Sequence, residues 1–428
     1  MNKYIIVIIA VIFASAVFHG LGLIQALPWS VFYSDILAFF DKATAPGLPY
    51  LDKLIEYPVL TGLFIQLVGY LGVTEAGYFI LTALFLSLFV IGSTYFLYEL
   101  LTNAAVHHSN PAKVGDESHP LTISSLRPVP TFASGGHPKQ SYINLFLYWI
   151  FTPSMFFFAI FNWDLMAIFF VVLAFYLYQK EKPYWSAVSL AAGFSAKFFP
   201  IIYLPLLLFK IEGWGRRVKA LGAFLTTAFL INAFFIVTNF NGWYYFFQLN
   251  AERNSNFDSI WTLARFIFPS LGANHINILS LLFFALAYIF IIYKFKNRNF
   301  IETCFAATLA FLLFNKVFSP QYILWLLPFF VFLFPPPLGG GGGPRFGPRW
   351  GSVYALLYSF YALEIANLAS FFISLQWFFS ATRDPFYFYI DIPFIIIRYG
   401  LLAYIFYSIL ISSPSERGRG KVGDSFLK

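Results

Sequence analysis

The chain has 428 residues, of which 59% are hydrophobic and only 11% are charged, and its mean hydropathy is +0.72. This composition excludes a soluble globular protein and predicts an all-α, polytopic membrane protein. The formal net charge of +8 would suggest nucleic-acid binding in a soluble chain, but basic loops on one membrane face explain it here, so we expect no nucleic-acid partner.

Apolar runs recur along the chain at spacings that fit helices crossing about 30 Å of hydrocarbon. They predict a single membrane domain over residues 1–428, with about 10–13 membrane-embedded helices. The expected segments are 4–26, 57–72, 76–101, 142–160, 164–179, 184–196, 199–209, 218–238, 275–294, 300–314, 321–334, 351–379 and 387–411. Four of them are shorter than the about 17–25 residues that a span needs, and we expect these to be re-entrant or buried in protein: 57–72, 184–196, 199–209 and 321–334.

The Lys and Arg residues orient the chain, because cytoplasmic connections carry an excess of them. The basic connections hold, with Lys3 and Lys219, 19 of the 27 Lys and Arg, and are predicted to be cytoplasmic: 102–141, 180–183, 210–217, 294–299, 335–350 and the tail after Ser412. The connections expected outside hold, with Glu75, Lys197 and Asp391, ten acids and seven bases: 27–56, 162–164, 239–274, 315–320 and 380–386.

This orientation is consistent only if segment 57–72 enters the membrane from outside without crossing it. Segments 184–196 and 199–209 must likewise form an up-and-down pair of half-length helices, with Ala196 and Lys197 at the outer tip. All the polar motifs described next then lie on the outer face.

The outer connection 27–56 carries an unusual number of acids for so apolar a chain. Charged groups held against a bilayer are expensive, so this connection is a candidate catalytic loop. Its notable residues, with the start of the next helix, are Tyr33-Ser34-Asp35-Ile36, Asp41, Pro49-Tyr50 and Glu56-Tyr57-Pro58.

Three further polar patches lie on the same predicted face. Each patch alone has an ordinary explanation: a lysine near a helix end commonly reaches the headgroups, and an Asn-Trp-Asp step can cap the following helix. Four patches on one face of an apolar chain are harder to explain in this way. The three are Asn162-Trp163-Asp164, Lys197 in Gly193 to Pro200, and Asn315-Lys316 to Gln321-Tyr322.

Carboxylates and cations together at an outer membrane surface fit sugar transfer from a lipid-linked phosphate. A carboxylate accepts the proton of an acceptor hydroxyl, and cations stabilise the charge that develops on the departing phosphate. An apolar groove between helices would hold the lipid chain.

The four patches, in this order, resemble the GT-C superfamily of polyprenyl-phosphate-sugar glycosyltransferases. Residues from about 30 to 330 are most similar to the catalytic-subunit family of GPI mannosyltransferase I and to the related prokaryotic family 87 mannosyltransferases. The most specific match is Asn-Lys-Val-x-x-x-Gln-Tyr-x-x-Trp, at Asn315 to Trp325. The other matching residues are Tyr33-Ser34-Asp35-Ile36, Asp41, Pro49-Tyr50, Tyr57-Pro58-Val59-Leu60, Asn162-Trp163-Asp164 and Lys197-Phe198-Phe199-Pro200.

The resemblance implies an inverting transferase that moves a hexose, with mannose preferred, from a polyprenyl or dolichyl phosphate to a glycan or glycolipid outside the cytoplasm. Asp35 would be the general base. Lys197 and Lys316 would bind the donor phosphate, and the donor sugar would contact Asn162, Asp164, Asn315, Gln321 and Tyr322. Supporting residues would be Asp41, Glu56, Tyr57 and Arg253. The family also leaves room for a small membrane partner subunit.

One departure from the family bears on cofactors. The second acid of the family's Asp-x-Asp pair is Leu37 here. Paired acids hold a divalent metal readily, whereas a single Asp beside Leu favours a general base, so a metal cofactor is not favoured.

Two alternatives stay open from the sequence. A secondary transporter also has broken helices and buried charges, although its ionisable groups lie near the midplane. A non-catalytic assembly subunit would keep the scaffold and lose the base. The absence of an Asn-x-Ser/Thr sequon and of an ER-retention tail favours a prokaryotic plasma membrane over the ER membrane.

Overall fold

The computed structural model describes residues 2–24, 29–109, 143–333, 353–380 and 384–411. Within these ranges the chain is helical, with one isolated bridge between Pro49 and Lys53 and no strand, so the predicted all-α class is confirmed. The predicted connection 335–350 and all but the first residues of 102–141 lie outside the described residues.

The N-terminal helices are α1 Asn2–Gly20, η1 Leu21–Ile24, α2 Trp29–Phe32, α3 Asp35–Ala38, α4 Phe40–Thr44, α5 Val59–Gly72 and α6 Glu75–Ser109. The central helices are η3 Phe146–Ile150, α8 Pro153–Phe158, α9 Asp164–Gln179, α10 Pro183–Ala196, η4 Phe199–Ile202, α11 Tyr203–Lys210, α12 Trp214–Thr238, α13 Phe240–Glu252 and α14 Ile260–Ile267. The C-terminal helices are α15 Ala273–Lys294, α16 Phe300–Phe314, η5 Pro320–Trp325, α17 Leu327–Leu333, α18 Val353–Phe379 and α19 Pro385–Ile411.

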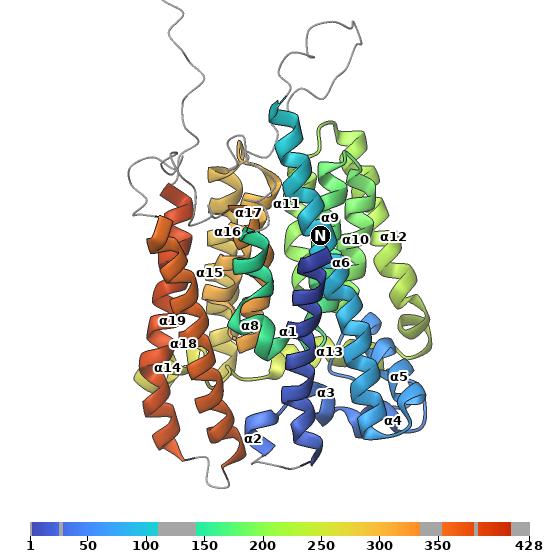
Figure 1. The fold of residues 1–428 in the computed structure, drawn as a ribbon, viewed down its shortest axis with the longest axis vertical. Coiled ribbons are helices and arrows are strands. Elements are labelled where there is room, and N and C mark those ends of the chain that lie inside the picture. The colour runs from blue at the N-terminus through green and yellow to red at the C-terminus, as the bar shows by residue number, and fades with distance from the viewer. Residues whose placement is uncertain (1, 25–28, 110–142, 334–352, 381–383, 412–428) are drawn as a thin grey trace, which may run out of the picture.

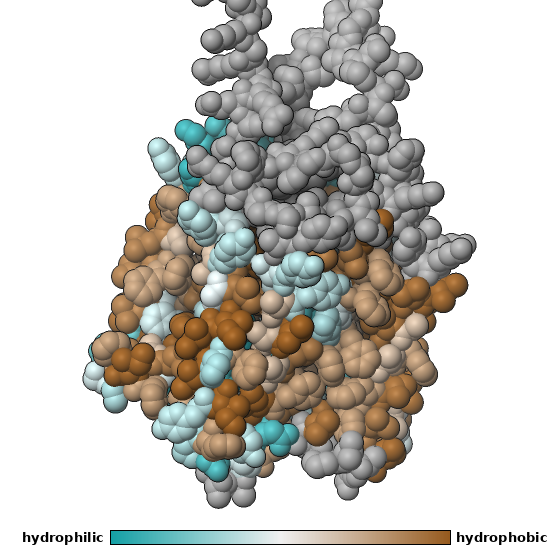
Figure 2. Space-filling model, turned by 60° about the vertical axis from the view of Figure 1, so that its left-hand side comes forward, coloured by the Kyte–Doolittle hydropathy of each residue, from teal (hydrophilic) through white to brown (hydrophobic). Residues whose placement is uncertain are grey.

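Among the described residues, six helices are long and apolar enough to cross a membrane. They are Ile5–Ile24, Glu75–Thr102, Trp214–Thr238, Ala273–Lys294, Leu357–Phe379 and Pro385–Leu410. Shorter apolar helices, among them α5, α9 and α16, pack between them. Brown, hydrophobic side chains dominate the middle of the face shown in Figure 2. The chain is therefore a multi-pass membrane protein, as predicted.

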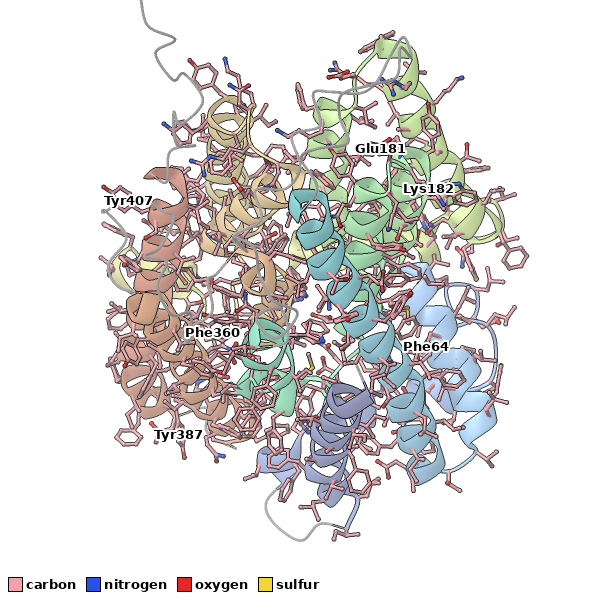
Figure 3. All side chains as sticks on the ribbon, turned by 45° about the horizontal axis from the view of Figure 1, so that its top comes forward. Phe64, Glu181, Lys182, Phe360, Tyr387 and Tyr407 are labelled. Carbon is pink, nitrogen blue, oxygen red and sulfur yellow. The ribbon has the colours of Figure 1, made fainter. Side chains whose placement is uncertain are left out.

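The helices pack as a bundle with the longest axis along the spans (Figure 1). Helix α10 packs against α9, α12 and α5, while α18 and α19 form a pair at the opposite side of the bundle. The turn at Glu181 and Lys182 lies toward the same end as Tyr407, near the end of α19, and Tyr387 lies at the other end (Figure 3). This arrangement is the one that the charge-based orientation requires, although the sidedness itself stays a prediction.

Two stretches differ from the sequence-based expectation. The predicted helix over 142–160 is broken after the π-helix η3, because Pro153 disfavours a helical conformation at Thr152, which is extended and caps α8 instead. The outer connection 239–274 was expected to be a loop, but it contains α13 and α14, whose N-caps Asn239 and Ser259 accept hydrogen bonds from the first turn.

Tyr50 of the outer loop packs directly against Gly62 of α5 and Gly242 of α13. A Cβ atom on Gly62 of α5 would lie 2.0 Å from the Tyr50 hydroxyl, and one on Gly242 of α13 would lie 1.9 Å from the Tyr50 carbonyl oxygen. Only glycine allows such close approach. The contact fixes the loop that follows α4 against the rest of the bundle.

Candidate active site

Asp35 opens helix α3, where Ser34 caps the helix by accepting a hydrogen bond from the Leu37 amide at 3.3 Å. The cap directs the half-buried Asp35 carboxylate toward two tyrosines. The Tyr33 hydroxyl donates to Oδ1 at 3.0 Å, and the Tyr57 hydroxyl donates to Oδ2 at 3.2 Å. Both donors favour the ionised carboxylate.

Burial raises the pKa of Asp35 to about 6, against the two tyrosine hydrogen bonds and the positive charge of Lys197, which lower it. The negative charge of Asp164 adds to the increase. At neutral pH the group is therefore a carboxylate, yet it accepts a proton more readily than an exposed aspartate does. These are the properties that a general base needs.

Asp164 and Lys197 form an ion pair beside Asp35. The Lys197 ammonium lies 2.5 Å from Asp164 Oδ1, and the Asp164 side chain is fully buried. Trp325 Nε1 donates to Asp164 Oδ2 at 2.9 Å. Asn162 Oδ1 accepts the Asp164 backbone N–H at 3.0 Å, so the Asn162 side chain shapes the turn that presents Asp164.

Lys197 lies at the end of α10, in the break before η4, where segments 184–196 and 199–209 were expected to join. Its ammonium lies 5.2 Å from the Tyr57 ring centroid and 5.8 Å from that of Tyr322. Burial lowers the pKa of Lys197, but the Asp164 carboxylate, Tyr322 and Asp35 together outweigh this effect and the pKa is raised. Lys197 is therefore a permanent cation whose side chain is 16% exposed.

The structure thus brings together Asp35, Tyr57, Asp164, Lys197 and Tyr322, which we call the active-site cluster. These five residues come from four distant segments of the chain. The carboxylates of Asp35 and Asp164 lie near the Lys197 ammonium, and of the two only Asp164 forms a direct ion pair with it. Such an arrangement of perturbed ionisable groups is typical of a catalytic site.

Other candidate residues lie elsewhere. Lys316 donates to the carbonyls of Ala251 and Arg253 at 3.0 and 2.9 Å, so its ammonium caps the end of α13. Asn315 donates to the nearby Val317 carbonyl at 2.7 Å. Gln321 is buried in η5, Asp41 and Arg253 are exposed, and Glu56 forms a surface ion pair with Lys42. The roles predicted for these residues stay predictions.

The residues present do not fit a divalent metal. Leu37, at the second position of the expected acid pair, is only 3% exposed and belongs to the core. The carboxylate nearest to Asp35 that could share a metal, Asp164, already holds the Lys197 ammonium. Within the described ranges no three His, Cys, Asp or Glu side chains gather closely enough to hold an ion.

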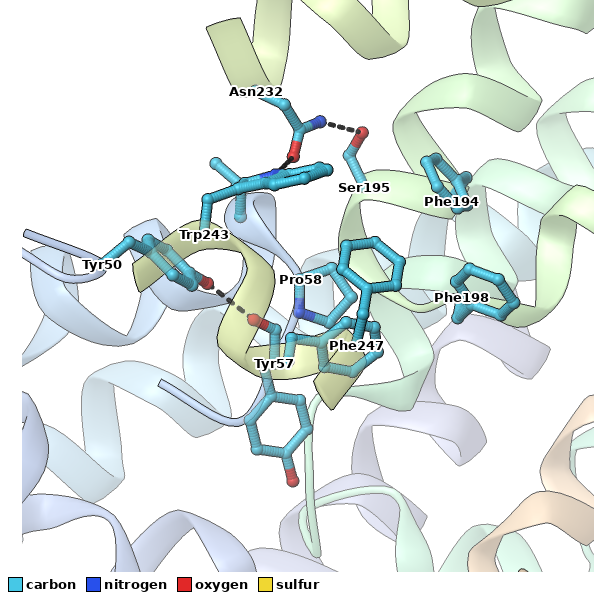
Figure 4. Close-up of a pocket in the computed structure, with 11 residues that line it drawn as sticks. Tyr50, Tyr57, Pro58, Phe194, Ser195, Phe198, Asn232, Trp243 and Phe247 are labelled. Carbon is cyan, nitrogen blue, oxygen red and sulfur yellow. Dashed lines mark hydrogen bonds between the residues drawn. The ribbon is translucent and has the colours of Figure 1, made fainter. Parts of the chain in front are cut away.

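A cavity lies on the other side of Tyr57 (Figure 4). Asn232 orients part of its wall, accepting a hydrogen bond from Trp243 Nε1 at 2.9 Å and donating to Ser195 Oγ at 3.3 Å. These polar atoms satisfy one another, which leaves mostly rings and apolar carbon facing the cavity. The lining residues are Tyr50, Tyr57, Pro58, Val59, Phe194, Ser195, Phe198, Asn232, Trp243, Phe246 and Phe247.

The cavity borders surfaces that face the bilayer. Phe198 is 41% exposed, and α12, which contributes Asn232, exposes Phe229, Leu230 and Phe234 on its outer side. Exposed apolar side chains thus flank the cavity, and Lys197 lies directly before Phe198 in the chain.

Two residues of the site were not among the expected functional residues. Tyr33 and Trp325 donate to the two carboxylates, and both stand within the motifs that carry the family resemblance. The motif was therefore the signal that could have identified them. Trp243 of α13 was expected to contact the acceptor as an exposed aromatic of the outer connection, whereas Asn232 of α12 and Phe246 and Phe247 of α13 had no such signal.

No model of a known protein family matches the chain. Over 220 residues it is 26% identical to the protein named GPI mannosyltransferase 1 of Trypanosoma brucei brucei, a match that covers 43% of this chain and 50% of that protein. Over 192 residues it is 24% identical to GPI mannosyltransferase 1 of Candida albicans, covering 39% of this chain and 48% of that protein.

These matches confirm the resemblance to GPI mannosyltransferases that the motifs indicated. The chain spans about half the length of the curated relatives it matches. Both relatives come from eukaryotes, so the expectation of a prokaryotic plasma membrane gains no support.

Proposed function

We propose that this chain is a membrane mannosyltransferase that moves mannose from a polyprenyl or dolichyl phosphate to a glycolipid or glycan acceptor on the extracytoplasmic face. The observation that carries the proposal is the convergence of Asp35, Asp164 and Lys197, from three separate segments, beside an apolar cavity. The similarity to two proteins named GPI mannosyltransferase 1 supports both the sugar and the glycolipid acceptor.

In the proposed reaction, the acceptor hydroxyl gives its proton to Asp35 as its oxygen bonds to the anomeric carbon of mannose. The bond between that carbon and the phosphate oxygen breaks, and the electron pair leaves with the lipid phosphate. Attack opposite the leaving group inverts the anomeric carbon. Lys197, a cation near the carboxylate base, stabilises the charge on the departing phosphate.

The cavity beside Tyr57 has room for little more than a water molecule in this structure, so the first isoprenoid units of the donor would enter it as its aromatic lining moves apart. Its aromatic wall suits an apolar chain, and Lys197, which pairs with Asp164, directly precedes the lining residue Phe198. Asp164, held by Trp325, would orient the hydroxyls of the donor sugar.

The test is transfer of radiolabelled mannose from dolichyl-phosphate-mannose to a glycolipid extract by the purified chain in proteoliposomes. We expect Asp35→Asn to reduce turnover by about 10²–10⁴-fold, the usual contribution of a general base, with a melting temperature at neutral pH no lower than that of the unaltered chain. Glu75→Gln, which changes an exposed acid in the first turn of α6, is the matched control and should keep normal transfer.

Full activity of Asp35→Asn would refute the assignment of the base. Absence of transfer in the unaltered chain, together with flux of a solute across the proteoliposome membrane, would instead favour the transporter alternative. A chain that neither transfers mannose nor carries a solute would fit the non-catalytic subunit.

A further inference from the structure

Arg398 of α19 is a fully buried cation within a membrane-spanning helix. Its Nη1 lies 3.1 Å from Asp258 Oδ2 and 3.3 Å from Asn367 Oδ1, and its Nη2 donates to the Asp258 carbonyl. We call Asp258, Asn367 and Arg398 the closing-helix network. A charge at such a place is expensive and is retained where it has a specific task.

The closing-helix network contacts the segment just before η5 and the first residue of η5. The Arg398 guanidinium carbon lies 4.1 Å from the Phe318 ring centroid, which is a close cation–π contact. Asn367 Nδ2 donates to the Pro320 carbonyl at 2.8 Å. Both contacts fall on Phe318 and Pro320, the unspecified positions of the family motif that separate Asn315-Lys316-Val317 from Gln321-Tyr322.

The same segment is held from its other side by the stretch around the end of α13. Lys316 donates to the Ala251 and Arg253 carbonyls, and Asn256 Nδ2 donates to the Phe318 carbonyl at 2.9 Å. The segment is therefore clamped between the outer connection and the pair α18–α19.

The clamped residues 315–321 are followed directly by Tyr322, a member of the active-site cluster. The Tyr322 ring stacks on Trp325 at 4.0 Å between centroids and faces the Lys197 ammonium. Trp325 in turn donates to Asp164. A displacement of residues 315–321 would therefore also move Tyr322, which faces Lys197, and Trp325, which bonds Asp164.

We propose that Arg398 is a positioning residue: by stacking on Phe318 and bonding Asn367, it fixes the segment 315–322 so that Tyr322 and Trp325 meet the Asp164–Lys197 pair. The proposal rests on the proposed function, and within that function it gives α18 and α19 the role of positioning the active site. Arg398 acts through these residues and is not itself a catalytic residue.

The test compares Arg398→Lys with the unaltered protein in detergent. Lysine keeps the charge opposite Asp258 but loses the planar stack on Phe318 and the fork that reaches Asn367. We expect faster amide hydrogen exchange in peptides covering 315–325, and a decrease in kcat of about 10–100-fold with a smaller change in KM for the donor, because a small misplacement has large effects on turnover.

Two further variants separate positioning from general destabilisation. Asn367→Leu removes the bond to Pro320 without altering any charge, and should give the same pattern of exchange and turnover. Arg298→Lys alters another largely buried ion pair, with Glu302 at 3.6 Å in the first turn of α16, and should leave both the 315–325 exchange and kcat unchanged.

Unchanged exchange over 315–325 in both Arg398→Lys and Asn367→Leu would overturn the proposal, as would a loss of turnover that Arg298→Lys reproduces. The exchange measurement does not depend on catalysis. If the unaltered chain transfers no mannose, the proposed function fails, and the exchange data still decide whether Arg398 positions this segment.

Discussion

The active-site cluster and the closing-helix network are both sets of buried charges, but they differ in access and in charge balance. The Lys197 side chain is 16% exposed, whereas that of Arg398 has no exposed surface. Lys197 stands between two acids, and one of these, Asp35, has its pKa raised by burial to about 6. Arg398 is matched by Asp258, whose carboxylate and main-chain carbonyl both accept hydrogen bonds from the Arg398 guanidinium.

The difference shows that burial of an ion pair does not by itself indicate chemistry. Three properties distinguish a catalytic group of charges from one that holds helices together: partial exposure, an additional carboxylate, and a pKa near the pH at which the protein works. The following substitutions challenge this distinction, beginning with the largest expected effect.

Lys197→Met should disable the active-site cluster. The fully buried Asp164 carboxylate would lose its partner, which typically costs about 3–5 kcal/mol of folding free energy. Transfer per folded molecule should fall by about 10²–10³-fold, since a preorganised charge is removed from the leaving phosphate. Thermal denaturation and initial rates measure the two effects. Retention of more than a tenth of normal transfer would contradict the role given to Lys197.

The pH dependence of transfer should report Asp35. Only the carboxylate accepts a proton, so kcat/KM should fall as the pH drops below about 6, with the slope of a single proton. Stability should change in the opposite sense: because the pKa is raised on folding, the contribution of Asp35 to stability is present at low pH and is lost as the pH rises through about 6.

Tyr33→Phe should shift this profile. It removes the 3.0 Å hydrogen bond to Asp35 Oδ1, which favours the ionised form, so the pH of half-maximal activity should rise by about one unit. Tyr70→Phe is the control, because Tyr70 is exposed and donates to the Gly47 carbonyl on the outer loop at 3.3 Å. A profile that moves equally in both variants would exclude Asp35 as the titrating base.

The smallest effect is expected at the surface pair of Lys42 and Glu56, whose side chains are 44% and 39% exposed. Lys42→Met should change the free energy of unfolding by less than about 1 kcal/mol, because solvent already screens the charges. A chemical denaturation curve measures this value. A loss comparable to that of Lys197→Met would show that exposure does not separate the charge groups in this chain.

Much of the site could be predicted because its residues follow local rules. Asp35, Asp164 and Lys197 each begin or end a short helix on one predicted face, and charge counting placed them together. The closing-helix network could not be found in this way. Asp258, Asn367 and Arg398 are far apart in sequence, and each alone is compatible with a loop or a helix interior.

Lys316 illustrates a second limit of sequence reasoning. Its motif was recognised, but its partners are main-chain carbonyls at the end of α13, a helix that the pattern of residues 239–274 did not predict. Carbonyl groups carry no sequence signal, so a cation that caps a helix cannot be told from one that awaits a phosphate until the backbone is placed.

Tyr57 links the active site and the cavity, since its hydroxyl bonds Asp35 while its backbone carbonyl accepts a hydrogen bond from Tyr50 among the residues that line the cavity (Figure 4). A guest in the cavity that shifts the Tyr57 backbone would alter the bond from its hydroxyl to the Asp35 carboxylate. By thermodynamic reciprocity, the factor by which the guest changes the proton affinity of Asp35 is the factor by which a proton changes the affinity for the guest. Under the proposed function, binding of the lipid donor in the cavity and the proton affinity of Asp35 would be coupled through Tyr57.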